Sequence, residues 1–262
     1  MSVKTSGAFI EVENLTIRFG GLLAVSDVSF HVSEGSIHAL IGPNGAGKTT
    51  ILNMISGIYR PSRGKIIYGG RNIVGLPPYM VTREGIARTF QNIQVFEGLS
   101  VLENVMVARH VRTSVNLLST ILKTPKARRE EKSIADKAVE ALRFVGLADR
   151  KDMDAVNLPY GQKRLMEIAR ALTTEPRLLL LDEPSAGMNE AEVLNLVNFI
   201  NQIREKGITV ILIEHNMRLV MKISDRITVL DFGEKIAEGP PEEIQNDPRV
   251  IEAYLGTENG YA

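Results

Sequence analysis

The chain has 262 residues, 44% of them hydrophobic, and its 31 Lys and Arg residues are balanced by 31 Asp and Glu residues. This composition supports a large core, in one domain with an inserted lobe or in two close domains. Zero net charge gives no support for a nucleic-acid-binding protein. The absence of cysteine excludes disulfides and thiol chemistry, which suits a reducing cytosol.

The N-terminal residues and the apolar runs favour neither a secreted nor a membrane-spanning chain. Met1 to Ala8 contain no apolar segment of signal-peptide length. The longest apolar runs, Leu178–Leu181 and Val210–Ile213, are far shorter than the roughly 20 residues of a membrane span. We therefore expect any membrane role to depend on a partner.

Two alternating segments near the N-terminus predict strands with one exposed face. Phe9–Phe19 alternates apolar and polar residues, and Val28–Val32 repeats the pattern. We expect them to form an antiparallel sheet beside a parallel one, and Lys65–Tyr68 to form a further strand. Phe19 lies at a turn, where its ring would either stack on an adenine or fill the core; composition alone favours the core.

The stretch after the predicted buried strand Ser36–Ile41 fits the phosphate-binding pattern GxxxxGK[ST]. It consists of Gly42, Pro43, Asn44, Gly45, Ala46, Gly47, Lys48, Thr49 and Thr50. A predicted helix over Thr49–Ile55 follows, so backbone N–H groups and the helix N-terminus would surround a phosphate. In this pattern Lys48 reaches the β- and γ-phosphates and Thr49 binds Mg²⁺. The alternative is a glycine-rich turn without function.

Residues 100–160 are predicted to be mostly helical, after a polar break at Thr89–Asn92. We expect one helix over Val101–Arg109 and a second over Lys132–Val145, whose apolar residues share one side. The basic, proline-interrupted segment Lys123–Arg129 lies between them and is predicted to be a solvated loop. The alternative is a contact with lipid headgroups or with a membrane subunit.

Strands and helices alternate again in the second half of the chain. Three short apolar segments predict strands of a parallel sheet: Leu178–Leu181, Ile208–Ile213 and Arg226–Leu230. Helices are expected over Gly161–Leu172 and after the N-cap Asn189. A hairpin follows through Lys235–Ala237, and the tail from Pro240 is predicted to be a charged helix with little core-forming power.

Three predicted strands end in chemically active groups, at the edge where parallel sheets bind ligands. The first runs into the phosphate loop, another ends in Asp182 and Glu183, and a third ends in His215. Asp182 is suited to hold Mg²⁺ through water, and Glu183 to orient or deprotonate an attacking water. His215 could donate to a γ-phosphate. The alternatives are a helix cap or salt bridge for the acidic pair and a structural histidine. Gln91 alone is uninformative.

Taken in chain order, these segments resemble the ATPase subunit of ATP-binding-cassette (ABC) transporters. The resemblance covers nearly the whole chain and rests on Phe19, the phosphate loop, Gln91, Leu158–Gln162, Leu178–Glu183, Ser185–Asn189 and His215. It implies that Phe19 stacks on adenine and that Gln91 contacts both Mg²⁺ and the membrane subunit. It also implies that Glu183 polarises water and that His215 senses the γ-phosphate.

The signature segment, made of Leu158, Pro159, Tyr160, Gly161 and Gln162, departs from the usual Leu-Ser-Gly-Gly-Gln of the family. In the family, two chains enclose two ATP molecules, each between one chain's phosphate loop and the other chain's signature. Pro159 has neither a hydroxyl nor an N–H to offer a phosphate, although the following helix still presents its N-terminus. We therefore expect a weakened signature, with a composite site unequal to that of a partner.

Four further segments are similar to the branch of the family that imports branched-chain amino acids: Gly85–Gln91, Val101–Val105, Glu214–Met221 and Ala253–Gly256. Urea importers and lipopolysaccharide exporters are close relatives of that branch. The resemblance implies an ATPase that uses ATP and Mg²⁺ and lies peripherally on the cytoplasmic face of the inner or plasma membrane. Its expected partners are transmembrane permease subunits, a second ATPase chain and, indirectly, a periplasmic or extracellular binding protein.

The alternative of another class is a soluble ABC protein that acts on ribosomes or DNA. Such proteins usually carry two cassettes or long coiled-coil insertions, and the sequence shows neither. We therefore expect no nucleic-acid partner.

The predicted fold is α/β, with a P-loop NTPase (RecA-like) parallel sheet, an N-terminal antiparallel β lobe and an inserted helical lobe. Residues 1–262 are predicted to form a single ABC ATPase domain. Its core is expected at about 8–91 and 161–240, its helical lobe at about 92–160, and a C-terminal helical tail at about 241–262.

Overall fold

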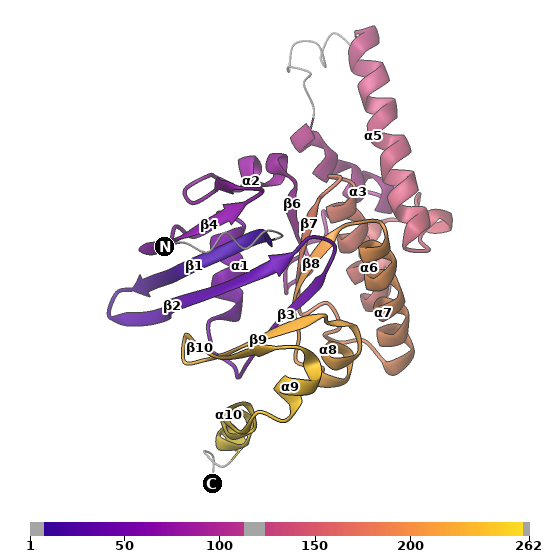
Figure 1. Ribbon diagram of the computed structural model, residues 1–262. Helices are drawn as coiled ribbons and strands as arrows, with labels where there is room; N and C mark the ends of the chain where they lie inside the picture. The colour runs from indigo at the N-terminus through magenta and orange to yellow at the C-terminus, as the bar shows by residue number, and fades with distance from the viewer. Residues whose placement is uncertain (1–7, 113–123, 259–262) are drawn as a thin grey trace.

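Figure 1 shows the computed structural model, which describes residues 8–112 and 124–258. Its strands are β1 (Ala8–Phe19), β2 (Leu22–Ser33), β3 (Ile37–Ile41), β4 (Arg63–Tyr68), β5 (Arg71–Asn72), β6 (Ile86–Arg88), β7 (Leu178–Asp182), β8 (Thr209–Ile213), β9 (Arg226–Asp231) and β10 (Glu234–Gly239). Its helices are α1 (Lys48–Ile55), α2 (Pro78–Glu84), α3 (Val101–Arg109), α5 (Pro125–Phe144), α6 (Tyr160–Leu172), α7 (Glu190–Glu205), α8 (Met217–Ile223), α9 (Pro241–Gln245) and α10 (Pro248–Glu258).

An antiparallel sheet forms from the N-terminal strands, as predicted. Its order within the described ranges is β2-β1-β4-β5. The register places Val12 of β1 opposite Phe30 of β2 and opposite Ile66 of β4. All three side chains are buried, because the alternating apolar residues of each strand point to the same side of the sheet.

The second sheet has the order β10-β9-β3-β8-β7-β6 within the described ranges, and its members from β9 to β6 run parallel. Every residue of β3, β7 and β8 is buried, which explains their continuous apolar sequences. β8 lies between β3 and β7. The phosphate loop, Asp182 and His215 therefore follow the carboxyl ends of three adjacent strands, at one edge of the sheet.

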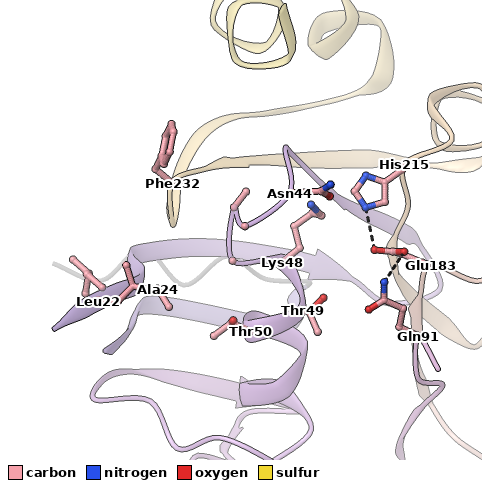
Figure 2. A pocket seen from close by; sticks show the side chains of 14 residues that line it. Leu22, Ala24, Asn44, Lys48, Thr49, Thr50, Gln91, Glu183, His215 and Phe232 are labelled. Atoms are coloured by element: carbon pink, nitrogen blue, oxygen red, sulfur yellow. Dashed lines mark hydrogen bonds and ion pairs between the residues drawn. The ribbon is translucent and has the colours of Figure 1, made fainter. Parts of the chain in front are cut away.

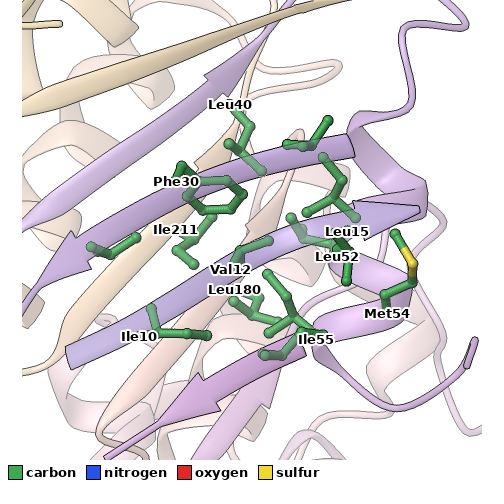
Figure 3. Packing of buried hydrophobic residues seen from close by; sticks show 14 of the residues in the cluster. Ile10, Val12, Leu15, Phe30, Leu40, Leu52, Met54, Ile55, Leu180 and Ile211 are labelled. Atoms are coloured by element: carbon green, nitrogen blue, oxygen red, sulfur yellow. The ribbon is translucent and has the colours of Figure 1, made fainter. Parts of the chain in front are cut away.

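An apolar core joins the two sheets and includes α1 (Figure 3). Val12 and Phe30 come from the antiparallel sheet, Leu52 comes from α1, and Leu180 and Ile211 come from the parallel sheet. The helix that follows the phosphate loop is thus packed between both sheets, which fixes the loop relative to the strand ends.

A second apolar cluster covers the opposite face of the parallel sheet. Leu179 and Leu181 of β7 belong to it together with Ile200 of α7, Met166 of α6 and Val105 of α3. α5 packs beside α3 and α6, so the helices that follow β6 form a lobe at one end of the sheet (Figure 1). The two sheets and these helices confirm the predicted α/β class.

The basic segment predicted to be a loop is mostly helical. α5 begins at Pro125, and Oγ1 of the N-cap Thr124 accepts a hydrogen bond from the Ala127 N–H at 3.3 Å. Proline is favoured in the first turn of a helix because its missing N–H would have no helical partner. The loop prediction is therefore wrong for residues 125–129, while Lys123 lies outside the described residues. No helix in the described ranges is both long and apolar enough to cross a bilayer.

The C-terminal tail contributes more to the core than its charge content suggests. It forms two helices, and Ile244 and Val250 are buried against Ala39 and Ile41 of β3. The prediction weighed the charged residues of the tail and missed the spacing of its apolar ones. The expectation of little core-forming power is therefore wrong, because the tail covers the strand that leads into the phosphate loop.

Candidate functional site

The phosphate loop connects β3 to α1 through backbone conformations that favour glycine. Gly42, Gly45 and Gly47 have φ values of +146°, +82° and +94°. A Cβ at Gly42 would collide with the Leu230 carbonyl oxygen, and one at Gly47 would lie 2.7 Å from the Ala24 carbonyl oxygen. The glycine spacing of the pattern thus has a steric cause in β9 and β2, in addition to the turn itself.

Lys48 is a buried cation at the start of α1. Its Nζ donates to the carbonyl oxygens of Gly42 at 2.7 Å and Pro43 at 2.9 Å. Burial lowers the pKa of this ammonium, while the negative charges of Glu183 and Asp182 raise it. The loop's own backbone therefore holds the ammonium in place, within the field of the acidic pair.

Asp182 is buried at the end of β7, beside Arg88 of β6. Arg88 Nη2 donates to Asp182 Oδ2 at 2.9 Å. Burial raises the pKa of the Asp182 carboxyl, and Arg88 and the Thr49 hydroxyl lower it. Oδ1 accepts no hydrogen bond from any residue that the structure describes. A buried carboxylate oxygen without a donor, near a threonine hydroxyl, fits the oxygen ligands that Mg²⁺ prefers.

Both carboxylate oxygens of Glu183 are engaged by neighbouring side chains (Figure 2). Gln91 Nε2 donates to Oε2 at 3.0 Å, and His215 Nε2 lies 3.0 Å from Oε1. The Glu183 backbone is left-handed, with φ +48°, and its N–H donates to the Ile213 carbonyl at 2.9 Å. The chain thus turns sharply out of β7 and presents this carboxylate beside the loop.

These groups border a cavity of about 360 Å³. Its lining consists of Leu22, Leu23, Ala24, Asn44, Gly45, Ala46, Gly47, Lys48, Thr49, Thr50, Gln91, Glu183, His215 and Phe232. Most of the predicted phosphate-loop residues, Gln91, Glu183 and His215 therefore meet around one space. Thr49 belongs to this lining, and its hydroxyl lowers the pKa of the Asp182 carboxyl.

The apolar end of the cavity differs from the prediction. Phe232, at the turn between β9 and β10, lines it and is 86% exposed. Phe19 is not among the described residues that line the cavity. Its ring lies edge-on to that of Tyr59, with the ring centroids 5.1 Å apart. Stacking of an adenine on Phe19 stays a prediction. The sequence signal for Phe232 was a large apolar residue at an expected hairpin turn.

Glu214 is a buried residue of the site that the sequence analysis did not single out. Its Oε1 accepts from the Ser185 N–H at 2.7 Å, and its Oε2 accepts from the N–H groups of His215 at 3.1 Å and Asn216 at 3.3 Å. One carboxylate thus joins the segment after Glu183 to the segment that carries His215.

The signature segment leads from the helical lobe into α6 and forms no part of the cavity lining. Leu158 is buried, and Pro159 is the N-cap of α6. Tyr160 packs against Gly187, where an added Cβ would lie 2.8 Å from the tyrosine Cε1. Gly161 lies against Glu192 in the same way, since a Cβ there would collide with its Oε1. The small residues allow α6 to approach both the segment before α7 and the first turn of α7.

Arg164 connects α6 to the segment that carries Gln91. Its Nη1 donates to the Phe90 carbonyl at 2.7 Å and to Glu167 Oε2 at 3.0 Å, and its Nη2 donates to the Gln91 carbonyl at 2.9 Å. A 3.3 Å contact links Nη2 to the Tyr160 hydroxyl. Burial raises the pKa of the Glu167 carboxyl, and the charge of Arg164 opposes that shift. The positions of Gln91 and of the signature therefore depend on the same guanidinium.

Two protein families and several known proteins match this chain, and all of them are ATP-binding transport proteins. The family described as "ABC transporter" matches residues 25–186, and the family described as "Branched-chain amino acid ATP-binding cassette transporter" matches residues 234–259. The chain is 46% identical to the high-affinity branched-chain amino acid transport ATP-binding protein BraF of Pseudomonas aeruginosa, over 96% of this chain and 99% of the relative. It is 44% identical to LivG of Escherichia coli, which has the same description, over the same shares.

Solved structures show the same likeness. A nucleotide-free ATP-binding cassette from an ABC transporter is 33% identical, with a TM-score of 0.83, over 94% of this chain and 98% of the other. The ADP conformation of MJ1267, an ATP-binding cassette of an ABC transporter, is 32% identical, with a TM-score of 0.83, over 95% and 99%.

Proposed function

This chain belongs to the ABC transporter family of ATP-binding proteins, and from that premise we propose that it hydrolyses ATP to power the import of branched-chain amino acids by partner subunits in a membrane. The observation that carries the proposal is the meeting of Lys48, Gln91, Glu183 and His215 around one cavity. A cavity with a phosphate loop on one wall and a carboxylate on the other suits phosphoryl transfer to water.

The residues at the strand ends divide between phosphate binding and metal binding. The loop N–H groups and Lys48 bind the phosphates. Thr49, Gln91 and Asp182 are the residues that would hold Mg²⁺, and the lack of a hydrogen-bond donor to Asp182 Oδ1 among the described residues supports this assignment. A bound Mg²⁺ would neutralise charge on the phosphate oxygens.

Glu183 is the residue that orients and deprotonates the attacking water in this proposal. In the present structure its oxygens are engaged by Gln91 and His215. Those two side chains are also the ones assigned to the metal and to the γ-phosphate. Nucleotide binding would draw Gln91 and His215 away from Glu183 and free its carboxylate for the attacking water. Without ATP, the Glu183 carboxylate therefore stays hydrogen-bonded to these two side chains.

A second ATPase chain, identical or not, completes the site. Because the signature segment does not line the cavity of its own chain, it is available to a nucleotide held by a partner. Pro159 offers that nucleotide no hydroxyl, so the composite site formed by this signature is the weaker one.

Permease subunits dock in a groove of about 500 Å³ between β6, α3 and α6. We call this space the groove; among the residues that line it are Phe90, Phe96, Val107, Arg88 and Glu167. Its apolar lining suits a helix of a partner protein, and Phe90 directly precedes Gln91, which links the groove to the site. The chain is then peripheral on the cytoplasmic face of the membrane.

The remaining organisation and the substrate follow the relatives. The chain forms one ABC ATPase domain, with a helical lobe at about 92–160 and a tail at about 241–262. The relatives named above are described as branched-chain amino acid transport proteins, which supports import of those amino acids. A periplasmic or extracellular binding protein would deliver them to the permeases.

The decisive experiment removes the charge of the loop. Lys48→Ala is expected to abolish ATP binding at millimolar nucleotide or below, measured by equilibrium dialysis with the folded protein. Undiminished binding would rule out the central assignment. For the substrate, the chain, its co-purified permeases and the second ATPase chain are reconstituted in vesicles loaded with ATP, with the binding protein added outside. Uptake of labelled leucine in the wild type, and none with Lys48→Ala, is the expected result.

A further inference from the structure

Arg88 is a buried cation that connects three parts of the fold. From the end of β6 its Nη1 donates to Asn53 Oδ1 at 2.7 Å and to Ser56 Oγ at 3.0 Å, at the C-terminal end of α1. Its Nη2 donates to Asp182 Oδ2 at 2.9 Å, at the end of β7. The strand before Gln91, the helix after the phosphate loop and the strand that carries Asp182 therefore share one guanidinium.

The two oxygens of Asp182 differ in their environment. Oδ2 is fixed by Arg88, whereas Oδ1 accepts no hydrogen bond in the described part of the chain. Buried polar atoms usually have a hydrogen-bond partner, so Oδ1 is an exception among the described residues. The protein fixes one oxygen with a cation, and near the same carboxyl it places the Thr49 hydroxyl, which is itself assigned to Mg²⁺.

We propose that Arg88 is the positioning residue of the metal site, which holds Asp182 by Oδ2 so that Oδ1 is presented to the Mg²⁺ that accompanies ATP. This inference rests on the proposed function, because it assigns a nucleotide-bound metal to Asp182. Residues that hold a metal ligand from behind orient it, and their mutation typically lowers metal affinity or activity about 10–100-fold.

The guanidinium is suited to this task because its own position is fixed. Asn53 and Ser56 hold Nη1 from α1, and the Phe90 ring lies 5.2 Å from the guanidinium carbon. The planar group therefore cannot follow a rotation of Asp182; it restrains that rotation. Phe90 and Arg88 also line the groove, so a partner seated there would lie one side chain away from Asp182.

Metal binding to the complex with a non-hydrolysable ATP analogue tests the inference. Mn²⁺ affinity of the complex with AMP-PNP is measured by electron paramagnetic resonance, and AMP-PNP affinity is measured separately in EDTA. Arg88→Met is expected to weaken Mn²⁺ binding about 10–100-fold. AMP-PNP affinity in EDTA is expected to remain unchanged, since the phosphate loop keeps its contacts. A merely structural role would lower thermal stability and leave Mn²⁺ affinity at the wild-type value.

Arg170→Met is the matched control. Arg170 also lines the groove and is largely buried; its guanidinium carbon lies 5.1 Å from the Phe96 ring, and its Nη1 donates to the Gln94 carbonyl at 2.7 Å. Its variant is expected to bind Mn²⁺ as the wild type does. Equal weakening by Arg170→Met would overturn the inference, because the effect would then come from groove packing.

Arg88→Lys keeps the charge and loses the planar pair of donors, so it is expected to bind Mn²⁺ with an affinity between those of the wild type and Arg88→Met. If Arg88→Met does not fold, wild-type Mn²⁺ affinity in Arg88→Lys overturns the inference. Normal AMP-PNP binding with unchanged Mn²⁺ affinity in a folded Arg88→Met protein overturns the inference alone. A wild-type protein that binds no AMP-PNP contradicts the proposed function as well.

Discussion

Arg164→Met is expected to destabilise the fold strongly, because it leaves a buried carboxylate without its cation. The side chains of Arg164 and Glu167 are 0% and 4% exposed, and their charged groups lie 3.0 Å apart. The change also removes the donors to the carbonyls of Phe90 and Gln91. Breaking a buried pair by removing one partner costs about 3–5 kcal/mol. For a chain of this size that corresponds to a fall in Tm of about 6–20 °C.

The free energy of unfolding is measured by urea titration followed by circular dichroism. Lys137→Met is the control, since Lys137 pairs with Glu140 at the same helical spacing but with side chains that are 42% and 63% exposed. Its loss is expected to cost less than about 1 kcal/mol. In a double-mutant cycle, Arg164→Met with Glu167→Met is expected to recover at least about 1 kcal/mol, because the uncompensated charge is removed.

The destabilisation should also depend on pH. Burial raises the pKa of Glu167, and loss of Arg164 raises it further. A carboxyl whose folded-state pKa lies above its unfolded value stabilises the fold at low pH and loses that contribution as pH rises through the folded-state pKa. The deficit of Arg164→Met is therefore expected to shrink as pH falls through the raised folded-state pKa of Glu167 and to grow as pH rises above it. A deficit below about 1 kcal/mol, or one that is constant with pH, would refute the reasoning.

Three further substitutions address the chemistry. Glu183→Gln is expected to keep ATP binding and to lower phosphate release by at least about 10²-fold; hydrolysis at the wild-type rate would remove Glu183 from the mechanism. Pro159→Ser is expected to raise turnover about tenfold at the site that uses this signature, since a hydrogen bond to a charged group contributes about 1.5–3 kcal/mol. The assay is single-turnover hydrolysis with the other site silenced, and an unchanged or lower rate would leave Pro159 as a helix start only. Phe19→Ala is expected to weaken ATP binding more than Phe232→Ala does, in fluorescence titrations; the reverse order would transfer base stacking to Phe232.

The sequence allowed the phosphate loop, Asp182, Glu183 and His215 to be predicted together. Each lies at or just after the end of a short apolar segment, and such a segment can be recognised as a buried strand from its own residues. β6 escaped prediction, since three residues are too few to show a period. Arg88 and Glu214 were missed for another reason. A charged residue at a strand end usually lies at the surface, and only the packing of strands distant in sequence buries the side chains of these two.

The left-handed backbone of Glu183 makes this position one where folding and activity favour different residues. With φ at +48°, a side chain there carries a strain of about 1–2 kcal/mol that glycine would relieve. A library selected only for resistance to heat is therefore expected to enrich glycine at this position and to lose the carboxylate. A library selected for growth on the transported nutrient would keep the glutamate, so the two selections would diverge at a single codon.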